Sequence, residues 1–392
     1  MKRNSLIILS ILLLITLNFC SKNKHILPQE EITPDNHPYP MVFSIGKTIE
    51  LDIITKGRMF FESNIDIPGY IYCGFLNASG DREIWQFNED LQIKSKYTIK
   101  YGQGPGEALN LRILGVDKQE IIGYDLLSNR LLFWDRNFSE CRMKKEIIWS
   151  SEKYPGSFAY SPITGSVLAL EAKIHGSDIF KPDLELTFRK LNGRDKSICL
   201  HKVEKWKTME ERIDGKIHSW LSIPLHSIIY RDYVFVVNLK DYHLFKYTLD
   251  GKLLRTIRVV FPQKTFSSTQ LKKWVKAELP RLKLEYLSRK HLQETLWPAC
   301  WILPLGDGIA VGRRDDYGPS GTKWINCDYF DMNLHYQGRI KIPAFEKWNS
   351  GLFSQSNVKY RMLSRSNNLY IINNDETTEK EIITQWTWKD EK

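Results

Sequence analysis

Hydrophobic and polar residues recur along most of the chain in blocks of one kind: an apolar strand, a polar turn, an aromatic-rich strand, another turn and a third strand. The clearest block has apolar stretches at 233–237, 243–247 and 253–260 with polar turns between them. Asp250-Gly251 between the last two stretches favours a β-hairpin, because glycine readily adopts the positive φ that tight turns need. Each block therefore predicts a small antiparallel sheet.

Six such blocks can be recognised along the sequence. They lie at 66–100, 110–147, 155–204, 225–261, 298–343 and 358–389. Most are close to the 40 to 50 or so residues expected for one blade of a β-propeller. No single sheet of this size can bury both of its faces, so neighbouring sheets must stack and close into a ring. The pattern predicts an all-β fold, a single six-bladed β-propeller over residues 41–392.

Two segments outside the blocks add to this prediction. The region before the first block alternates weakly at 42–54 and 58–61 and is expected to form strands, including one that closes the ring. Residues 264–295 break the β pattern and predict a short helical insertion. This insertion is either packed on the rim between two blades or acts as a lid or docking arm over one face of the ring.

The first residues resemble a bacterial secretory signal. Two positive charges at positions 2 and 3 precede an apolar stretch at 6–17, which is shorter than the roughly 20 residues needed to cross a bilayer. Cys20 follows at once, at the position where a lipoprotein signal peptidase leaves a lipidated cysteine. We expect a signal peptide at 1–19, lipidation of Cys20 and a polar, proline-containing tether at 20–40. The alternative is a cysteine that is simply lost on cleavage.

Charge and composition limit the kinds of binding partner that we expect. The formal net charge is +10, but lysine and arginine are mixed with acidic residues and form no basic stripe. We therefore expect no nucleic-acid partner, and expect membrane attachment through the N-terminal lipid. The domain would lie in the periplasm or at the cell surface, anchored to the inner or the outer membrane. The remaining five cysteines are widely spaced and are predicted to be buried strand residues: Cys73, Cys141, Cys199, Cys300 and Cys327.

The most distinctive run is Tyr101-Gly-Gln-Gly-Pro-Gly-Glu107, between the first two blocks. It resembles the G-x-G-P-G-E signature of six-bladed β-propeller lipoproteins of Bacteroidetes and related bacteria, distant cousins of NHL-repeat propellers. The resemblance covers residues 41–389 and implies the fold, whereas most such proteins have no assigned activity. The run is interpreted as a crossover turn between blades. In the alternative interpretation, Tyr101 and Glu107 line the mouth of the channel.

Familiar catalytic motifs are absent from the sequence, including nucleophile elbows, zinc-protease helices and nucleotide-binding loops. Histidines and carboxylates gather around the fourth block, where His218 and His243 lie on either side of His226 and Asp232 in the sequence. These residues are either ordinary surface and core groups or ligands of a metal in the central channel. The residues proposed to line the channel or a binding surface are Tyr101, Glu107, His226, Tyr230, Asp232, Arg314, Tyr317 and Trp324.

Three functions follow from this scaffold. The first is a binding or protein-interaction scaffold of the cell envelope, whose partner is a glycan, a peptide or an envelope protein. The second is a lactonase- or lyase-like enzyme that uses a Ca²⁺ or Zn²⁺ ion in the channel, although no cofactor is predicted directly. The third is an extracytoplasmic sensor domain.

Overall fold

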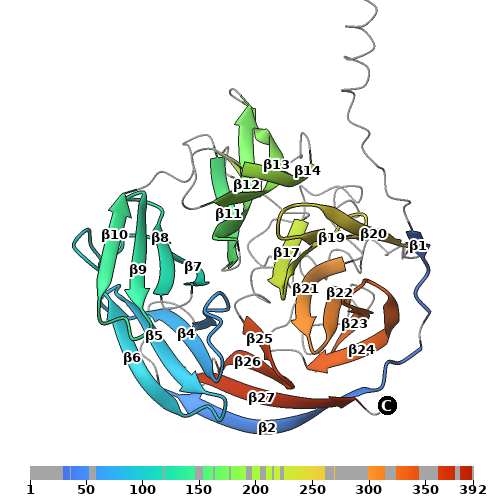
Figure 1. The fold of residues 1–392 in the computed structure, drawn as a ribbon, viewed down its shortest axis with the longest axis horizontal. Coiled ribbons are helices and arrows are strands. Elements are labelled where there is room, and N and C mark those ends of the chain that lie inside the picture. Colours follow the sequence, from blue (N-terminus) through green and yellow to red (C-terminus); the bar gives the residue numbers. More distant parts are fainter. Residues whose placement is uncertain are drawn as a thin grey trace, which may run out of the picture.

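The computed structural model is an almost entirely β structure in which six sheets form a ring, a six-bladed β-propeller (Figure 1). The residues that the structure describes are 30–35, 37–52, 59–117, 120–145, 153–161, 164–175, 178–190, 197–203, 209–213, 216–220, 225–260, 269, 299–313, 324–343, 361–375 and 380–390. The signal peptide, Cys20 and, apart from Thr269, the predicted insertion at 264–295 lie outside these residues.

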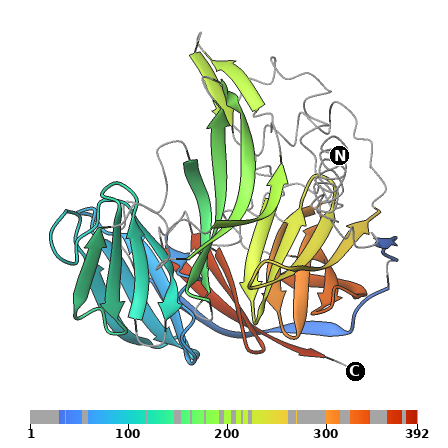
Figure 2. The same cartoon turned by 45° about the horizontal axis from the view of Figure 1, so that its top comes forward.

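Each blade contains four antiparallel strands, and the blades are numbered in chain order. Blade 1 contains β3 (Phe60–Phe61), β4 (Tyr70–Leu76), β5 (Arg82–Asn88) and β6 (Ile93–Ile99). Blade 2 contains β7 (Leu111–Asp117), β8 (Glu120–Asp125), β9 (Arg130–Asp135) and β10 (Cys141–Lys145). Blade 3 contains β11 (Lys153–Ser161), β12 (Ser166–His175), β13 (Asp178–Lys190) and β14 (Ser197–Val203). The strands β12 and β13 reach beyond those of the other blades (Figure 2).

The remaining blades follow the same plan. Blade 4 contains β17 (Leu225–Tyr230), β18 (Tyr233–Asn238), β19 (His243–Thr248) and β20 (Leu253–Val259). Blade 5 contains β21 (Ala299–Leu305), β22 (Gly308–Arg313), β23 (Trp324–Asp331) and β24 (Tyr336–Pro343). Blade 6 contains β25 (Met362–Arg365), β26 (Asn368–Asp375), β27 (Lys380–Asp390) and β2 (Met41–Leu51). A separate hairpin, β15 (Met209–Ile213) and β16 (Lys216–Trp220), falls between blades 3 and 4 in the sequence. Each of the six predicted blocks therefore falls on one of the six sheets, with β3 of blade 1 and β2 of blade 6 lying outside their blocks.

Blade 6 is built from both ends of the chain. Its first three strands come from the C-terminus, and β2 from the N-terminus pairs antiparallel with β27, from Met41↔Asp390 to Leu51↔Glu381. The predicted closing strand is thus confirmed. This pairing joins the N-terminal strand to the last blade and so closes the ring. A closed ring resists separation of its first and last blades.

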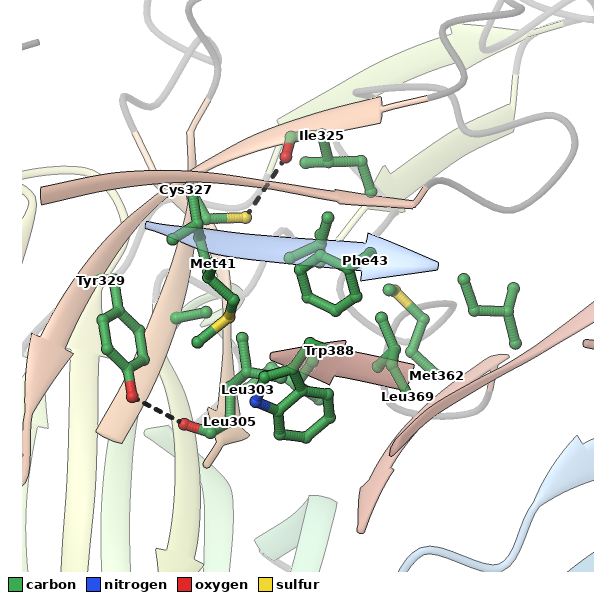
Figure 3. Close-up of a cluster of buried hydrophobic side chains, with 14 of the residues drawn as sticks. Met41, Phe43, Leu303, Leu305, Ile325, Cys327, Tyr329, Met362, Leu369 and Trp388 are labelled. Carbon is green, nitrogen blue, oxygen red and sulfur yellow. Dashed lines mark hydrogen bonds between the residues drawn. The ribbon is translucent and has the colours of Figure 1, made fainter. Parts of the chain in front are cut away.

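The hydrophobic core is divided into six clusters, one at each contact between adjacent blades. In β18, Val234 and Val236 pack toward blade 3, whereas Phe235 and Val237 pack toward blade 5. This alternation follows from the two-residue period of a strand, and it explains why the middle strands are apolar on both faces. Figure 3 shows the cluster between blades 5 and 6, where Phe43 of β2 lies beside Trp388.

The turns follow local sequence chemistry. Gly251 has φ of +90° in the β19–β20 turn, and its N–H donates to the Thr248 carbonyl at 3.0 Å. The hairpin predicted from Asp250-Gly251 is confirmed. The cysteines are less uniform than expected: Cys73 and Cys327 are buried, but Cys199 is exposed on β14, the outermost strand of blade 3.

The segment before β2 is bound to the propeller over part of its length. Strand β1 (Glu30–Ile32) pairs parallel with β20 as a fifth strand of blade 4, and Pro38 forms a bridge with Arg339 of blade 5 (Figure 1). Ordered structure was expected only from about Met41. A parallel strand of only three residues, with polar residues on both sides, has no recognisable sequence pattern. The pairing of this part of the tether could therefore not be predicted.

Candidate functional site

A cavity of about 560 Å³ lies within the ring and is lined by residues of five blades. Its walls come mainly from the ends of the innermost strands and the turns that follow them. These wall segments are 63–69, 226–231, 302–307 and 362–367, and Ala159, Met41 and Trp388 add to them. The cavity therefore occupies the end of the central channel at which the innermost strands finish.

Apolar side chains form much of the cavity wall. Met362 and Ile302 are almost fully buried, and Leu303, Leu363 and Trp388 are buried as well. These residues also belong to the clusters between blades. The walls are consequently fixed by the packing that holds the ring together, which gives a preformed apolar surface for a ligand.

Two arginine–aspartate pairs lie at the cavity, and each joins neighbouring blades. Arg231, after β17, pairs with Asp307 in the turn after β21. Arg365, at the end of β25, pairs with Asp66, and its Nη2 also donates to the Ile65 carbonyl at 2.7 Å. One pair thus connects blade 4 to blade 5, and the other connects blade 6 to blade 1.

Two of the predicted site residues are brought together here. His226 and Tyr230 both line the cavity from β17. The Ile302 N–H donates to Nδ1 of His226 at 3.1 Å, which assigns the ring proton to Nε2, and the Tyr230 hydroxyl donates to the Gly306 carbonyl. Both side chains therefore contact blade 5. Asp232 is exposed in the β17–β18 turn and is not part of the lining.

The glycine-rich run lies elsewhere. It joins the end of β6 to the start of β7, whereas the cavity lies where innermost strands finish, so the run is at the opposite end of the ring. Glu107 folds back onto the run itself, and its Oε2 accepts from the Gly104 N–H at 2.6 Å. A Cβ at Gly102 would stand 2.2 Å from the same oxygen. Tyr101 is 62% exposed. This geometry matches a crossover turn.

Arg130 holds this crossover to blade 2. Its Nη1 donates to the Gln103 carbonyl at 2.6 Å, and its Nη2 donates to the Glu107 carbonyl at 3.1 Å. The guanidinium also pairs with the fully buried Asp125. The polar groups of the run are therefore largely satisfied within the fold.

The other predicted residues that the structure describes do not line the cavity. Trp324 is exposed at the start of β23 and stacks edge-on against Trp386 at 5.7 Å between ring centroids. His243 lies beside Phe245 on β19. Arg314 and Tyr317 lie outside the described residues, and the side chain of His218 does too.

Sequence reasoning missed Arg231, Asp307, Arg365 and Asp66. A signal was present for two of them, because Arg231 and Asp307 both lie in the turn that follows the first strand of a block. Aligning the blocks by their first turns would have drawn attention to charged residues recurring at one end of the ring.

Among the residues that the structure describes, no group of three or more His, Cys, Asp or Glu side chains is arranged to hold a metal ion. Among the same residues, no helix has the length and hydrophobicity needed to span a bilayer.

No family model and no curated protein matches the chain. Among solved structures, it is similar to a protein of Bacteroides fragilis described as exported, with 11% identity, 93% of this chain and 99% of that chain covered, and a TM-score of 0.49. It is also similar to a DUF4221-family protein of Bacteroides vulgatus, with 12% identity, coverage of 90% and 99%, and a TM-score of 0.49. A luciferin-regenerating enzyme reaches 9% identity, coverage of 84% and 91%, and a TM-score of 0.39.

Proposed function

We propose that this chain is a lipid-anchored cell-envelope propeller that works as a binding scaffold, with the central cavity as its ligand site. The observation that carries the proposal is the cavity itself, whose apolar wall and polar rim are assembled from five blades. Small-molecule sites in proteins typically have volumes of about 300 to 1,000 Å³, and the 560 Å³ found here falls in that range.

The N-terminal sequence supports the proposed location. A basic start, a short apolar stretch and Cys20 favour export and lipidation, and the glycine-rich run resembles that of envelope propeller lipoproteins. In this arrangement the lipid holds the chain at a membrane, and the cavity captures a glycan fragment, a peptide end or another small envelope molecule.

The test is a binding screen on the chain from residue 21 onward. Glycan fragments and short peptides are screened by the shift of the thermal midpoint, since a ligand that binds only the folded state raises it. The cavity is then filled by Ser364→Phe, at a half-buried lining residue on β25. The matched control is Ser95→Phe, at a half-buried residue on β6, the outermost strand of blade 1.

A hit should be lost in Ser364→Phe and kept in Ser95→Phe. A hit that both variants retain would place binding elsewhere and overturn the proposed site. Turnover of a hit, together with one metal ion per chain in protein purified without chelator and a loss of stability in EDTA, would favour the metal-dependent enzyme instead.

A further inference from the structure

Arg365 is the most unusual polar residue of the cavity. Its side chain is 10% exposed, and its Nε is buried with no hydrogen-bond partner among the described residues. Only Nη1, toward Asp66, and Nη2, toward the Ile65 carbonyl, have partners. A guanidinium has five N–H donors, so this one has lost much of its water without replacing it.

Three carboxylates line the cavity; Glu89 is half-buried, whereas the two aspartates that pair with the arginines are well exposed. Asp66 is 82% exposed and Asp307 is 91% exposed, so both keep their hydration. Exposed ion pairs contribute little free energy to stability or binding, because water solvates the separated charges well. The aspartates therefore have little to gain from a ligand cation, whereas Arg365 gains from any acceptor that reaches its free N–H groups.

We infer that the cavity takes an amphipathic anion, with its apolar body against the Met362 and Leu303 wall and its acid group at Arg365. This inference rests on the proposed function, because it names the class of ligand for the same site. Arg231 adds a second positive group at the rim and is half exposed, so it can turn from Asp307 toward a ligand. The net charge of +10 favours the approach of anions.

The experiment compares three probes that share one chain and differ in charge: decanoate, decan-1-ol and decylammonium. Binding to the chain from residue 21 onward is measured by calorimetry, each probe below its aggregation concentration. We expect decanoate to bind with a stoichiometry of one and about 10-fold more tightly than decan-1-ol, the gain typical of one charge-assisted hydrogen bond. Decylammonium should bind more weakly than decan-1-ol.

Variants assign the selectivity to Arg365. Arg365→Gln should bring decanoate to the affinity of decan-1-ol and leave decan-1-ol unchanged, which also reports that the cavity remains folded. Arg365→Lys, which keeps the charge but not the fork of donors, should retain part of the preference. Arg258→Gln, at an exposed arginine of β20 paired with Glu31, is the matched control and should change nothing.

The outcomes separate the inference from the proposed function. Equal binding of decanoate and decan-1-ol, tighter binding of decylammonium, or no binding of any probe would overturn the inference. A decanoate preference that survives Arg365→Gln would also overturn it. The proposed site itself fails only if ligands bind Ser364→Phe as well as they bind the unmodified chain.

Discussion

The contact between blades 3 and 4 should make the propeller less stable at mildly acidic pH. His201 of β14 and His243 of β19 both contact Phe245, with ring centroids 4.5 and 4.8 Å from that of the phenylalanine. Burial, and after it the nearby charge of His243, together lower the pKa of His201 from 6.5 to about 4. Burial, followed by the charge of Arg258, also lowers the pKa of His243. Both rings are therefore held neutral in the folded protein.

The size of the effect follows from the shift of His201. Its pKa is lower in the folded than in the unfolded state, so its contribution to stability is complete above pH 6.5 and is lost as the pH falls toward 4. Between pH 8 and pH 5 the free energy of unfolding should fall by up to about 2 kcal/mol through this residue alone, given 1.36 kcal/mol for each pKa unit. His243 acts in the same direction.

The assay is denaturant unfolding at pH 8 and pH 5 for the unmodified chain and for His201→Gln, which has a side chain that does not titrate. Other groups also titrate in this range, so the informative quantity is the difference between the two proteins. His201→Gln should lose about 2 kcal/mol less than the unmodified chain on acidification. Equal losses in the two proteins would show that His201 is not held neutral by this contact.

Three further perturbations test other parts of the structure. Phe43→Ala in the closing strand should cost about 3 kcal/mol of unfolding free energy in denaturant titrations, because a buried aromatic ring is removed, whereas the exposed neighbour change Val42→Ala should cost under about 0.5. Gly104→Ala should lower the thermal midpoint, because the added Cβ would stand 2.8 Å from Glu107 Oε2. In a chain that already carries Glu107→Ala, Gly104→Ala should lower the midpoint much less. Equal shifts in the two chains would contradict this contact. Cys20→Ala should abolish incorporation of a labelled fatty acid and release the protein from membranes, and unchanged labelling would exclude Cys20 as the lipid site.

The repeat could be predicted because each blade is encoded locally. Strand and turn patterns repeat within about 40 residues, and buried positions on both faces of strands such as β18 leave continuous apolar runs. The closing strand β2 was also visible, since it has the same pattern and no local partner. Even the glycine-rich run was interpretable, because a glycine- and proline-rich crossover is shaped by its own backbone.

The candidate site was only partly predictable. His226 and Tyr230 were found because they lie together on one strand, and alternate residues of a strand share a face. The arginine–aspartate pair of Arg365 and Asp66 was missed, because its two residues are separated by 299 positions in the sequence. No local pattern links residues so far apart.

Hydrophobic period and turn chemistry act over short distances, so the number of blades, most of their strands and the presence of a ring-closing strand could be predicted from the amino-acid sequence. The folded chain alone shows which turns meet around the channel, which arginine loses its water there, and that β1 pairs with blade 4. These features depend on the angle at which successive blades pack. That angle arises from the fit of buried side chains across all six contacts together, so no single segment of the sequence specifies it.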